Sequence, residues 1–449
     1  MKNKISFSCT HCTYKTVKWL GCCPECKEWD SFVEVQQTTK SVPSIQGPAM
    51  TMHTFATIPV TSAARLSAGV DEWDRVMGGG IMPGSLMILT GDPGIGKSTL
   101  LLQIAHALSL NHCVYYFSTE ESLVQVRQRA DRLELHNSPL LFSDTADLDS
   151  VIATATTQKP DIIIIDSIQN CFITDAQSLP GSIGQLREAT FKLMRLSKEH
   201  TITVIMTGHI TKEGIIAGPK TLEHMVDAVF YLQGDDRFET RILRSVKNRF
   251  GTINELGFFD MTTKGLTEVS NINELLINQA THTPGSALVS IIEGSRPLII
   301  EVQALTIFSK LAMPQRVISG LDHKQVVLIA AILEKYIRIK LSVHDIFAKV
   351  SGGFKLANNG TDLGIALALL SSYFQQPLPP HSIAFGDIHL TGQIRPISII
   401  VPLMREGEKF GITTFFMAKG QKIEKTSAQC IKFGHVYELL SLFSEEKSE

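Results

Sequence analysis

The chain lacks long apolar runs and an excess of charge of either sign. No stretch reaches the roughly 18 uncharged apolar residues that a membrane-spanning helix needs, and the opening MKNKISFSCTHC lacks the apolar run of a secretory signal. The 42 Lys and Arg residues are balanced by 44 Asp and Glu residues, for a formal net charge of -2. The sequence therefore predicts a cytoplasmic protein with no membrane partner, in which any polyanion site is local.

Cysteine is scarce outside one short segment. Five of the eight cysteines lie between residues 9 and 26, in CTHCTYKTVKWLGCCPEC. The remaining three, Cys113, Cys171 and Cys430, stand alone and are expected to be buried small apolar side chains. Clustered thiols in a reducing compartment favour a bound metal over disulfides.

A tetrahedral metal needs four thiolates, so one of the five clustered cysteines is spare. Two C-x₂-C pairs separated by ten residues are typical of a structural zinc ribbon, and an alternative set uses Cys22 with its x₃ spacing to Cys26. We favour Cys22 as the spare residue and expect Trp19 and Trp29 to supply the small core of the module. The preferred Zn²⁺ ligands are Cys9, Cys12, Cys23 and Cys26.

The pattern of apolar and polar residues divides the rest of the chain into an α/β region and a final α+β region. Four apolar runs alternate with amphipathic stretches of helical length, which predicts a mainly parallel sheet covered by helices. These runs are 85–92, 113–119, 161–167 and 201–209. Three further short runs are expected to extend the sheet with antiparallel strands. They are 225–232, 240–246 and 254–261.

Four segments follow from this division. They are 1–35, a zinc ribbon; 36–59, a polar linker; 60–275, a P-loop ATPase domain; and 276–449, an α+β domain with helices near 323–337 and 361–375.

The segment GDPGIGKST at 91–99 matches G-x-x-x-x-G-K-[ST] between an apolar strand and an amphipathic helix. Its glycines let backbone N–H groups surround phosphate oxygens, Lys97 brings positive charge to the β and γ phosphates, and Ser98 offers a hydroxyl to Mg²⁺. The predicted ATP-binding residues are Gly91, Asp92, Pro93, Gly94, Ile95, Gly96, Lys97, Ser98 and Thr99.

Two carboxylates are predicted to complete this site. Asp166 ends the apolar run DIIIIDS, where it would lie beside the Mg²⁺ at the carboxyl edge of the sheet. An acid after a strand is by itself more typical of a solvated turn, but the neighbouring P-loop favours the metal role. Glu120 follows another core strand in FSTEES and is predicted to orient the attacking water.

With these residues the chain resembles the RadA/Sms family of bacterial recombination ATPases, which have a RecA-like core. The resemblance covers nearly the whole length, including RVMGGGIMPGSLMILTGDPGIGKSTLLLQ, GHITKEGIIAGPKTLEHMVD and SVKNRFGTINELG. The KNRFG segment at 247–251 is the most discriminating part. The resemblance implies a hexameric ring with ATP between subunits, acting on single-stranded and branched DNA with a RecA-type recombinase to extend heteroduplex by branch migration.

The resemblance also assigns roles to basic and polar residues. Lys247 and Arg249 would reach across a subunit interface, and on an alternating strand they would share one face with Arg241. Thr207 and His209 would sense the γ-phosphate, with a simply packed histidine as the less favoured alternative. These roles are expectations from the resemblance.

Two glycine-containing loops, 178–188 and 211–220, lie where RecA-like proteins contact single-stranded DNA. Arg187, Lys212 and Lys220 could follow phosphates there, with many copies supplied by a ring. No aromatic residues are interleaved, so base stacking is not indicated.

The last third resembles the peptidase domain of Lon-type proteases but lacks its catalytic pair. Gly360 stands at the nucleophile position and Val401 where the lysine base should fall, so this domain is predicted to be a scaffold without peptidase activity. Its basic residues are either a DNA surface or a solvated face. They are Arg316, Lys335, Arg338, Lys340 and Lys355.

The leading hypothesis is a DNA-dependent ATP hydrolase of homologous recombination and repair. A RecA-like regulatory ATPase or kinase acting on protein is the alternative, but such relatives lack a Cys₄ module and the KNRFG context. A Lon-type ATP-dependent peptidase is disfavoured by the missing catalytic pair.

Overall fold

The computed structural model describes residues 5–12, 14–36, 54–57, 64–174, 179, 181–209, 221–234, 240–356 and 359–443. By residue contacts the chain divides into two units, Met1–Ser62 and Ala63–Glu449. Among the described residues, no helix is both long enough and apolar enough to cross a membrane.

The N-terminal unit contains a three-stranded antiparallel sheet of order β2-β1-β3. Its strands are β1 (Ile5–Cys9), β2 (Lys15–Thr16) and β3 (Phe32–Gln36). Cys9, Cys23 and Phe32 form the buried centre. The expectation for the tryptophans is wrong, since Trp19 is 53% and Trp29 77% exposed. The clustered cysteines occupy the centre, and a module this small has no second layer to cover an indole ring.

The second unit contains a nine-stranded sheet of order β12-β11-β10-β9-β4-β8-β7-β5-β6. The four core strands predicted from the sequence are confirmed, and neighbouring strands from β9 to β6 are all parallel. The strands are β4 (Leu86–Gly91), β5 (Val114–Ser118), β6 (Leu141–Ser143), β7 (Ile162–Asp166), β8 (Thr203–His209), β9 (Ala228–Gly234), β10 (Thr240–Asn248), β11 (Leu256–Thr262) and β12 (Gly265–Glu268).

The antiparallel extension begins one strand later than expected. β9 pairs in parallel with β4, whereas β10, β11 and β12 are antiparallel to their neighbours. The reason is that the connection from β8 to β9, which contains α6, returns the chain to the end of the sheet where β8 starts, so β9 runs in the direction of the core strands.

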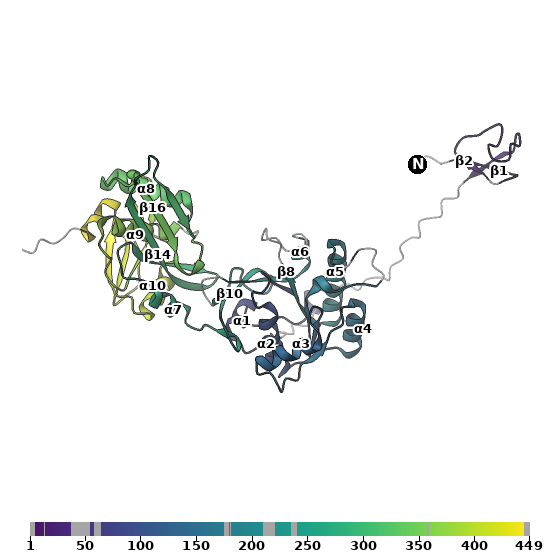
Figure 1. Cartoon of the computed structure of the whole chain (residues 1–449), viewed down its shortest axis with the longest axis horizontal. Helices are drawn as coiled ribbons and strands as arrows, with labels where there is room; N and C mark the ends of the chain where they lie inside the picture. Colours follow the sequence, from purple (N-terminus) through teal and green to yellow (C-terminus); the bar gives the residue numbers. More distant parts are fainter. Residues whose placement is uncertain are drawn as a thin grey trace, which may run out of the picture. The chain divides into compact units, whose positions relative to one another are not determined.

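Helices cover both faces of this sheet. One core joins α1 and α2 to the sheet through Trp73, Leu101 and Phe230, and the other joins α4 and α5 through Val151 and Leu193. Figure 1 shows α4 and α5 side by side, as their contacts require. The helices are α1 (Asp71–Met77), α2 (Lys97–Ser109), α3 (Leu123–Arg132), α4 (Leu148–Gln158), α5 (Ile183–His200) and α6 (Thr221–Met225).

The C-terminal region is built on a mixed seven-stranded sheet of order β15-β16-β14-β13-β17-β20-β21. Its strands are β13 (Ser286–Glu293), β14 (Arg296–Phe308), β15 (Arg316–Ser319), β16 (His344–Val350), β17 (Ser382–Phe385), β20 (Thr414–Ala418) and β21 (Gln429–Phe433), with a separate pair β18 (Asp387–Ile388) and β19 (Ile394–Arg395). The two predicted helices are confirmed as α8 (His323–Ile337) and α9 (Asp362–Phe374). The other helices of this region are α7 (Ile272–Gln279) and α10 (Val401–Lys409).

Short 3₁₀ turns occur along the described parts of the whole chain. They are η1 (Phe55–Thr57), η2 (Ile168–Asn170), η3 (Leu341–Val343), η4 (Ser351–Gly353), η5 (Asn359–Thr361) and η6 (Val436–Leu442).

Strand β11 belongs to two cores at once. Phe259 lies in the core with α1 and α2, while Leu256 and Phe258 lie in the core of the C-terminal sheet. The predicted boundary at 275/276 falls within α7, whose Ile272 and Leu276 also lie in the C-terminal core. The ATPase region and the C-terminal domain therefore share β11, which contributes side chains to the core of each. The exact boundary between them stays a prediction.

A buried ion pair crosses the same junction. Arg296 Nη1 of β14 donates to both oxygens of Glu72 in α1 at 3.0 and 2.9 Å, and the Glu72 side chain is 2% exposed. The Arg296 guanidinium also lies 5.1 Å from the centre of the Phe258 ring. The same Glu72 carboxylate accepts the backbone N–H of Phe258.

Candidate nucleotide site and metal centre

The P-loop connects the end of β4 at Gly91 to the start of α2 at Lys97. Gly96 has a φ of +109°, a backbone conformation in which any other residue would be strained, so glycine is favoured there. Lys97 Nζ donates to the carbonyl oxygens of Gly91 and Asp92, both at 2.9 Å. The ammonium group is thus held inside the loop where phosphates would bind.

Burial lowers the pKa of Lys97, and the nearby carboxylates of Asp166, Glu120 and Asp92 oppose that shift. Lys97 is 6% exposed. These three acids are therefore close enough to interact electrostatically with the P-loop lysine. The structure brings together the predicted lysine, the predicted metal-binding acid and the predicted water-orienting acid.

Asp166 ends β7 and is held by two hydroxyl groups. Thr207 Oγ1, from β8, donates to Asp166 Oδ1 at 2.7 Å, and Tyr116 Oη, from β5, donates to Asp166 Oδ2 at 2.7 Å. All three side chains are buried. Burial, followed by the nearby Asp166, raises the pKa of Tyr116 well above its usual value, so the phenol stays a donor at neutral pH.

Sequence reasoning missed Tyr116. It lies in the apolar run CVYYFST, where a tyrosine looks like any other core residue, so no signal in the sequence distinguishes it. Thr207 was predicted as a phosphate sensor, and the structure orients its hydroxyl to Asp166. The side chain of His209 lies outside the described residues.

Glu120 follows β5 at the same edge of the sheet. Its carboxylate accepts a hydrogen bond from Ser167 Oγ, the residue after Asp166. The ends of β5 and β7 are also joined by Thr119 N–H, which donates to Asp166 O at 2.8 Å. Nearby, the buried Oε1 of Gln169 has no hydrogen-bond partner among the described residues.

The basic residues of β10 do not share one face as expected. Ser245 pairs with Phe230 but Lys247 pairs with Val229, because Val246 forms a β-bulge. One extra residue reverses the alternation, so Arg241 and Lys247 lie on opposite faces of the sheet. The prediction that Arg241, Lys247 and Arg249 lie together is therefore wrong, and Arg249 follows the end of the strand.

Lys247 and Arg249 lie at the end of the sheet away from their own P-loop. Lys247 pairs with Val229, which pairs with Ile88, about 10 Å along the strand before Gly91. Arg249 is farther still, since its N–H donates to Asp227 O while Asp227 N–H donates to Leu86 O. Neither side chain can reach a nucleotide bound at the P-loop of the same subunit.

Both residues have partners within the chain. Lys247 Nζ donates to the carbonyl oxygens of Glu223 and Val226 at the end of α6, and burial lowers its pKa. Arg249 and Lys198 both contact Asp227, which is 4% exposed. Asp227 was not singled out from the sequence, because a single acid before a strand is usually a turn residue.

The predicted DNA residues are only partly described. Arg187 was expected in a loop, but α5 begins at Ile183 with Ser182 as N-cap, so Arg187 is helical. The side chain of Arg187 is exposed. Lys212 and Lys220 lie outside the described residues.

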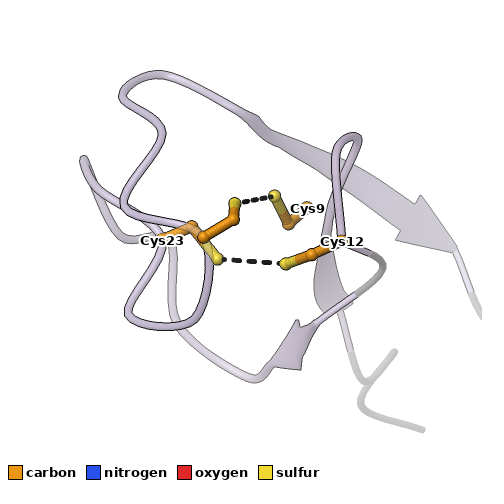
Figure 2. A group of neighbouring side chains, drawn as sticks. Cys9, Cys12 and Cys23 are labelled. Carbon is orange, nitrogen blue, oxygen red and sulfur yellow. Dashed lines mark hydrogen bonds between the residues drawn. The ribbon is translucent and has the colours of Figure 1, made fainter.

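The four predicted zinc ligands come together in the N-terminal unit. The sulfur atoms of Cys9, Cys12, Cys23 and Cys26 all lie within 4.8 Å of one another. Figure 2 shows the side chains of Cys12 and Cys23 pointing toward each other. Their sulfurs lie 3.4 Å apart, and those of Cys9 and Cys26 lie 3.6 Å apart. Zn–S bonds of about 2.3 Å in a tetrahedron separate sulfurs by about 3.8 Å, so the four thiols fit a zinc ion.

Cys22 lies outside this set. Its sulfur contacts the carbonyl oxygen of Lys27 at 3.4 Å instead. The hydrogen bond to Ser31 lowers the pKa of Cys9 to about 6, which favours the thiolate that binds metals. Of the isolated cysteines, Cys171 is buried as expected but Cys113 is exposed, because it precedes β5 at the edge of the core.

No peptidase pair forms among the described residues of the C-terminal domain. Gly360 precedes α9 and Val401 begins α10, and neither has a side chain that could act as nucleophile or base. The guanidinium of Arg316, one of the basic residues considered for a DNA surface, already has hydrogen-bond partners within the domain. It donates to the carbonyl oxygens of Gln315 and Leu341 at 2.9 and 3.0 Å.

Three segments match described families. Residues 53–214 match the AAA domain, residues 7–34 match the rubredoxin metal binding domain, and residues 314–421 match subunit ChlI of Mg-chelatase. Among solved structures, a DnaB-like replicative helicase is 16% identical with a TM-score of 0.42, covering 46% of this chain and 62% of its own. The RadB recombinase is 20% identical with a TM-score of 0.37, covering 46% of this chain and 100% of its own.

Fold and site together define a RecA-like P-loop ATPase with a zinc-binding Cys₄ ribbon. The DNA repair protein RadA of Bacillus subtilis is 40% identical over 421 residues, covering 91% of each chain. That of Listeria monocytogenes is 40% identical over 428 residues, covering 94% of this chain and 93% of its own. The chain belongs to the RadA family of DNA repair proteins, and its AAA domain implies ATP hydrolysis.

Proposed function

We propose that this protein is a DNA-dependent ATPase of homologous recombination and recombinational repair. It forms a ring, a hexamer, that moves along single-stranded DNA and extends heteroduplex by branch migration, together with a RecA-type recombinase. Membership of the RadA family supports the repair role. The observation that favours a ring is the position of Lys247 and Arg249, at the end of the sheet away from their own P-loop.

The residues around the P-loop have distinct roles in this proposal. Lys97 leaves its carbonyl partners to bind the β and γ phosphates, and Ser98 and Asp166 hold Mg²⁺, which neutralises phosphate charge. Because both oxygens of Asp166 already accept hydroxyl hydrogen bonds, this acid is fixed in position before metal arrives. Glu120 orients the attacking water.

Lys247 and Arg249 act on the nucleotide of the neighbouring subunit. Both must exchange their present partners, the carbonyls at the end of α6 and the Asp227 carboxylate, for phosphate oxygens. In the sequence α6 directly follows the predicted DNA-contacting residues 211–220, so Lys247 links the neighbour's nucleotide to the helix next to that segment. This connection couples ATP turnover to DNA contacts through Arg187, Lys212 and Lys220.

The deciding experiment measures ATP turnover with and without single-stranded DNA over a range of salt concentrations. We expect DNA to raise turnover at low salt, with the effect falling as salt rises, because phosphate contacts release counterions. Lys97→Ala should reduce turnover by about 100-fold or more. Lys264→Ala, which removes a lysine that is 68% exposed, is the matched control and should behave as wild type.

A turnover rate that DNA does not change at any salt concentration would contradict the motor role. Degradation of casein by the purified protein would instead favour a peptidase. Turnover stimulated by a protein and not by DNA would favour a regulatory ATPase.

A further inference from the structure

The C-terminal domain contains a cavity of about 750 Å³ between α8 and β18, which we call the α8–β18 cavity. Its walls are mostly apolar, and Leu328 and Leu390 on its lining are 50% and 68% exposed. Volumes of this size are typical of ligand-binding sites. None of the roles described above uses it.

Half of the polar side chains that line this cavity are acidic. Asp322, Asp362 and Asp387 line it together with a single lysine, Lys355, and with His389. Asp362 is 6% exposed and accepts hydrogen bonds from Gln325 Nε2 and, at 3.0 Å, from Ile388 N–H. Burial, followed by a hydrogen bond with the adjacent Asp387, raises the pKa of Asp362 to about 7. The cavity therefore favours an occupant with an apolar surface and a cation.

The same domain has a loop with those properties at 308–316, with sequence FSKLAMPQR. Phe308, Leu311 and Met313 are 66%, 54% and 83% exposed, and Lys310 is exposed as well. The segment contains no carboxylate. Adjacent exposed apolar side chains of this kind usually mark an interaction surface.

The loop is held at both ends. Ser309 N–H donates to Val343 O at 3.0 Å, and Gln315 N–H donates to the Asp345 carboxylate at 2.7 Å. Edge strand β15 then separates the loop from Gly320, where the cavity begins, by about 13 Å. The loop and the cavity of one molecule thus lie at opposite ends of β15, so the loop cannot fill its own cavity.

We propose that the 308–316 loop of one subunit docks into the α8–β18 cavity of a second copy of this chain. Leu311 and Met313 contact the apolar wall, and Lys310 lies near Asp322 and Asp387. Two different surfaces that fit each other make a head-to-tail contact, which closes into a ring when it is repeated around an axis. The inference rests on the proposed ring and identifies a contact that holds it together.

The test places a benzophenone amino acid at position 313 of the full-length protein. Irradiation should join two chains, seen as a species of doubled mass on a denaturing gel. Mass spectrometry should map the crosslink to residues 320–332 or 386–390. A crosslink within one chain, to another region or to added single-stranded DNA would overturn the inference.

Substitutions give a second, independent measurement. Met313→Asp and Leu390→Asp should each raise the concentration at which the oligomer dissociates by about tenfold or more, because each introduces a charge into an apolar contact. Ile399→Asp is the matched control, since Ile399 is 58% exposed and outside the cavity lining. Unchanged thermal unfolding shows that the variants fold.

The outcomes separate this inference from the proposed function. A wild-type protein that stays monomeric with ATP and DNA contradicts the ring as well as the docking. An oligomer that both variants leave intact contradicts only the docking of the 308–316 loop.

Discussion

Asp166 is fixed by hydroxyl groups from both neighbouring strands. Tyr116 and Thr207 each donate to one of its oxygens at 2.7 Å. A carboxylate held on both oxygens keeps one orientation, and its negative charge is stabilised in a buried site where solvent cannot do so. The predicted metal-binding residue is thus positioned by side chains from the two neighbouring strands.

Tyr116→Phe should therefore weaken metal binding without disturbing the fold. We expect turnover at low Mg²⁺ to fall about tenfold, because a hydrogen bond to a buried charge is lost, and to recover in part at high Mg²⁺. Turnover is measured as a function of Mg²⁺ concentration. Tyr115→Phe is the control, since its hydroxyl bonds to Gln158 on an exposed surface. An unchanged Mg²⁺ dependence of Tyr116→Phe would show that this hydroxyl has no role at the metal.

The zinc ligands permit a comparison between adjacent residues. Cys23→Ser should lose zinc and unfold the N-terminal unit, because Cys23 belongs to the sulfur cluster and is fully buried. Cys22→Ser should keep one zinc per chain. The measurement is metal content after gel filtration. The reverse result would assign Cys22 to the site.

At the residue scale, the sequence predicts positions whose chemistry has a fixed spacing. The P-loop and the two C-x₂-C pairs are recognisable because each needs its residue types at set intervals. Tyr116 could not be predicted, since its role depends on a strand 50 residues away in the chain. The exposure of Trp19 was mispredicted because a module centred on thiols needs little apolar core.

Among the elements, β10 shows how one residue changes a surface. The bulge at Val246 lets Lys247 contact the end of α6 while Arg241 remains on the opposite face, where a Cβ on Gly234 would contact both Arg241 and Ile95 of the P-loop. One strand thus has a basic residue near its own P-loop and others far from it.

Mixing two inactive variants tests whether Lys247 acts on a neighbour. Lys97→Ala lacks the P-loop lysine, and Lys247→Ala lacks the proposed trans-acting residue. In rings formed from an equal mixture, about a quarter of the interfaces combine an intact P-loop with an intact Lys247 from the adjacent subunit. Turnover should rise above that of either variant alone.

If Lys247 served only its own subunit or only the fold, every mixed ring would stay inactive. The thermal unfolding of Lys247→Ala is measured in parallel, because its ammonium also holds the carbonyl oxygens of Glu223 and Val226.

At the element scale, the strands and helices of the core were predictable because each is long and periodic. The bulge in β10 was not, because RILRSVKN alternates well enough to predict a regular strand. The parallel direction of β9 was also missed, since direction depends on the whole path of the chain and not on local pattern.

For the whole molecule, the ATPase region and the C-terminal domain are joined through buried groups. The Arg296 and Glu72 side chains are 11% and 2% exposed, and Leu256 and Phe258 complete the C-terminal core. A junction of this kind resists relative movement more than a polar interface does.

Arg296→Met should lower the melting temperature by several degrees, because it leaves the Glu72 carboxylate buried without its main partner, at a cost on the order of 3 kcal/mol. Arg75, 3.5 Å from Glu72, compensates only in part. Adding Glu72→Gln should restore much of the loss. Arg405→Met is the control, since its ion pair with Glu424 is 71% and 56% exposed and exposed pairs contribute little. Equal melting temperatures for Arg296→Met and wild type would contradict the role of this pair.

At this scale the sequence predicted the order of the parts and not how they join. A change in the sequence pattern near residue 275 suggests separate domains. In the structure, however, the adjacent residues Phe258 and Phe259 belong to two different cores, so the two domains are joined. A strand that is buried on both faces within one domain and a strand that is shared by two domains have the same local sequence pattern.

The shared strand has a consequence for synthesis of the protein on the ribosome. β11 leaves the exit tunnel well before β13 to β21, so the ATPase region can fold while Leu256 and Phe258 still face water. Until the remainder of the chain is made, the nascent protein presents an apolar strand face of the kind that chaperones bind. Release of the finished chain, and not completion of the P-loop domain, is the point at which this surface is permanently covered.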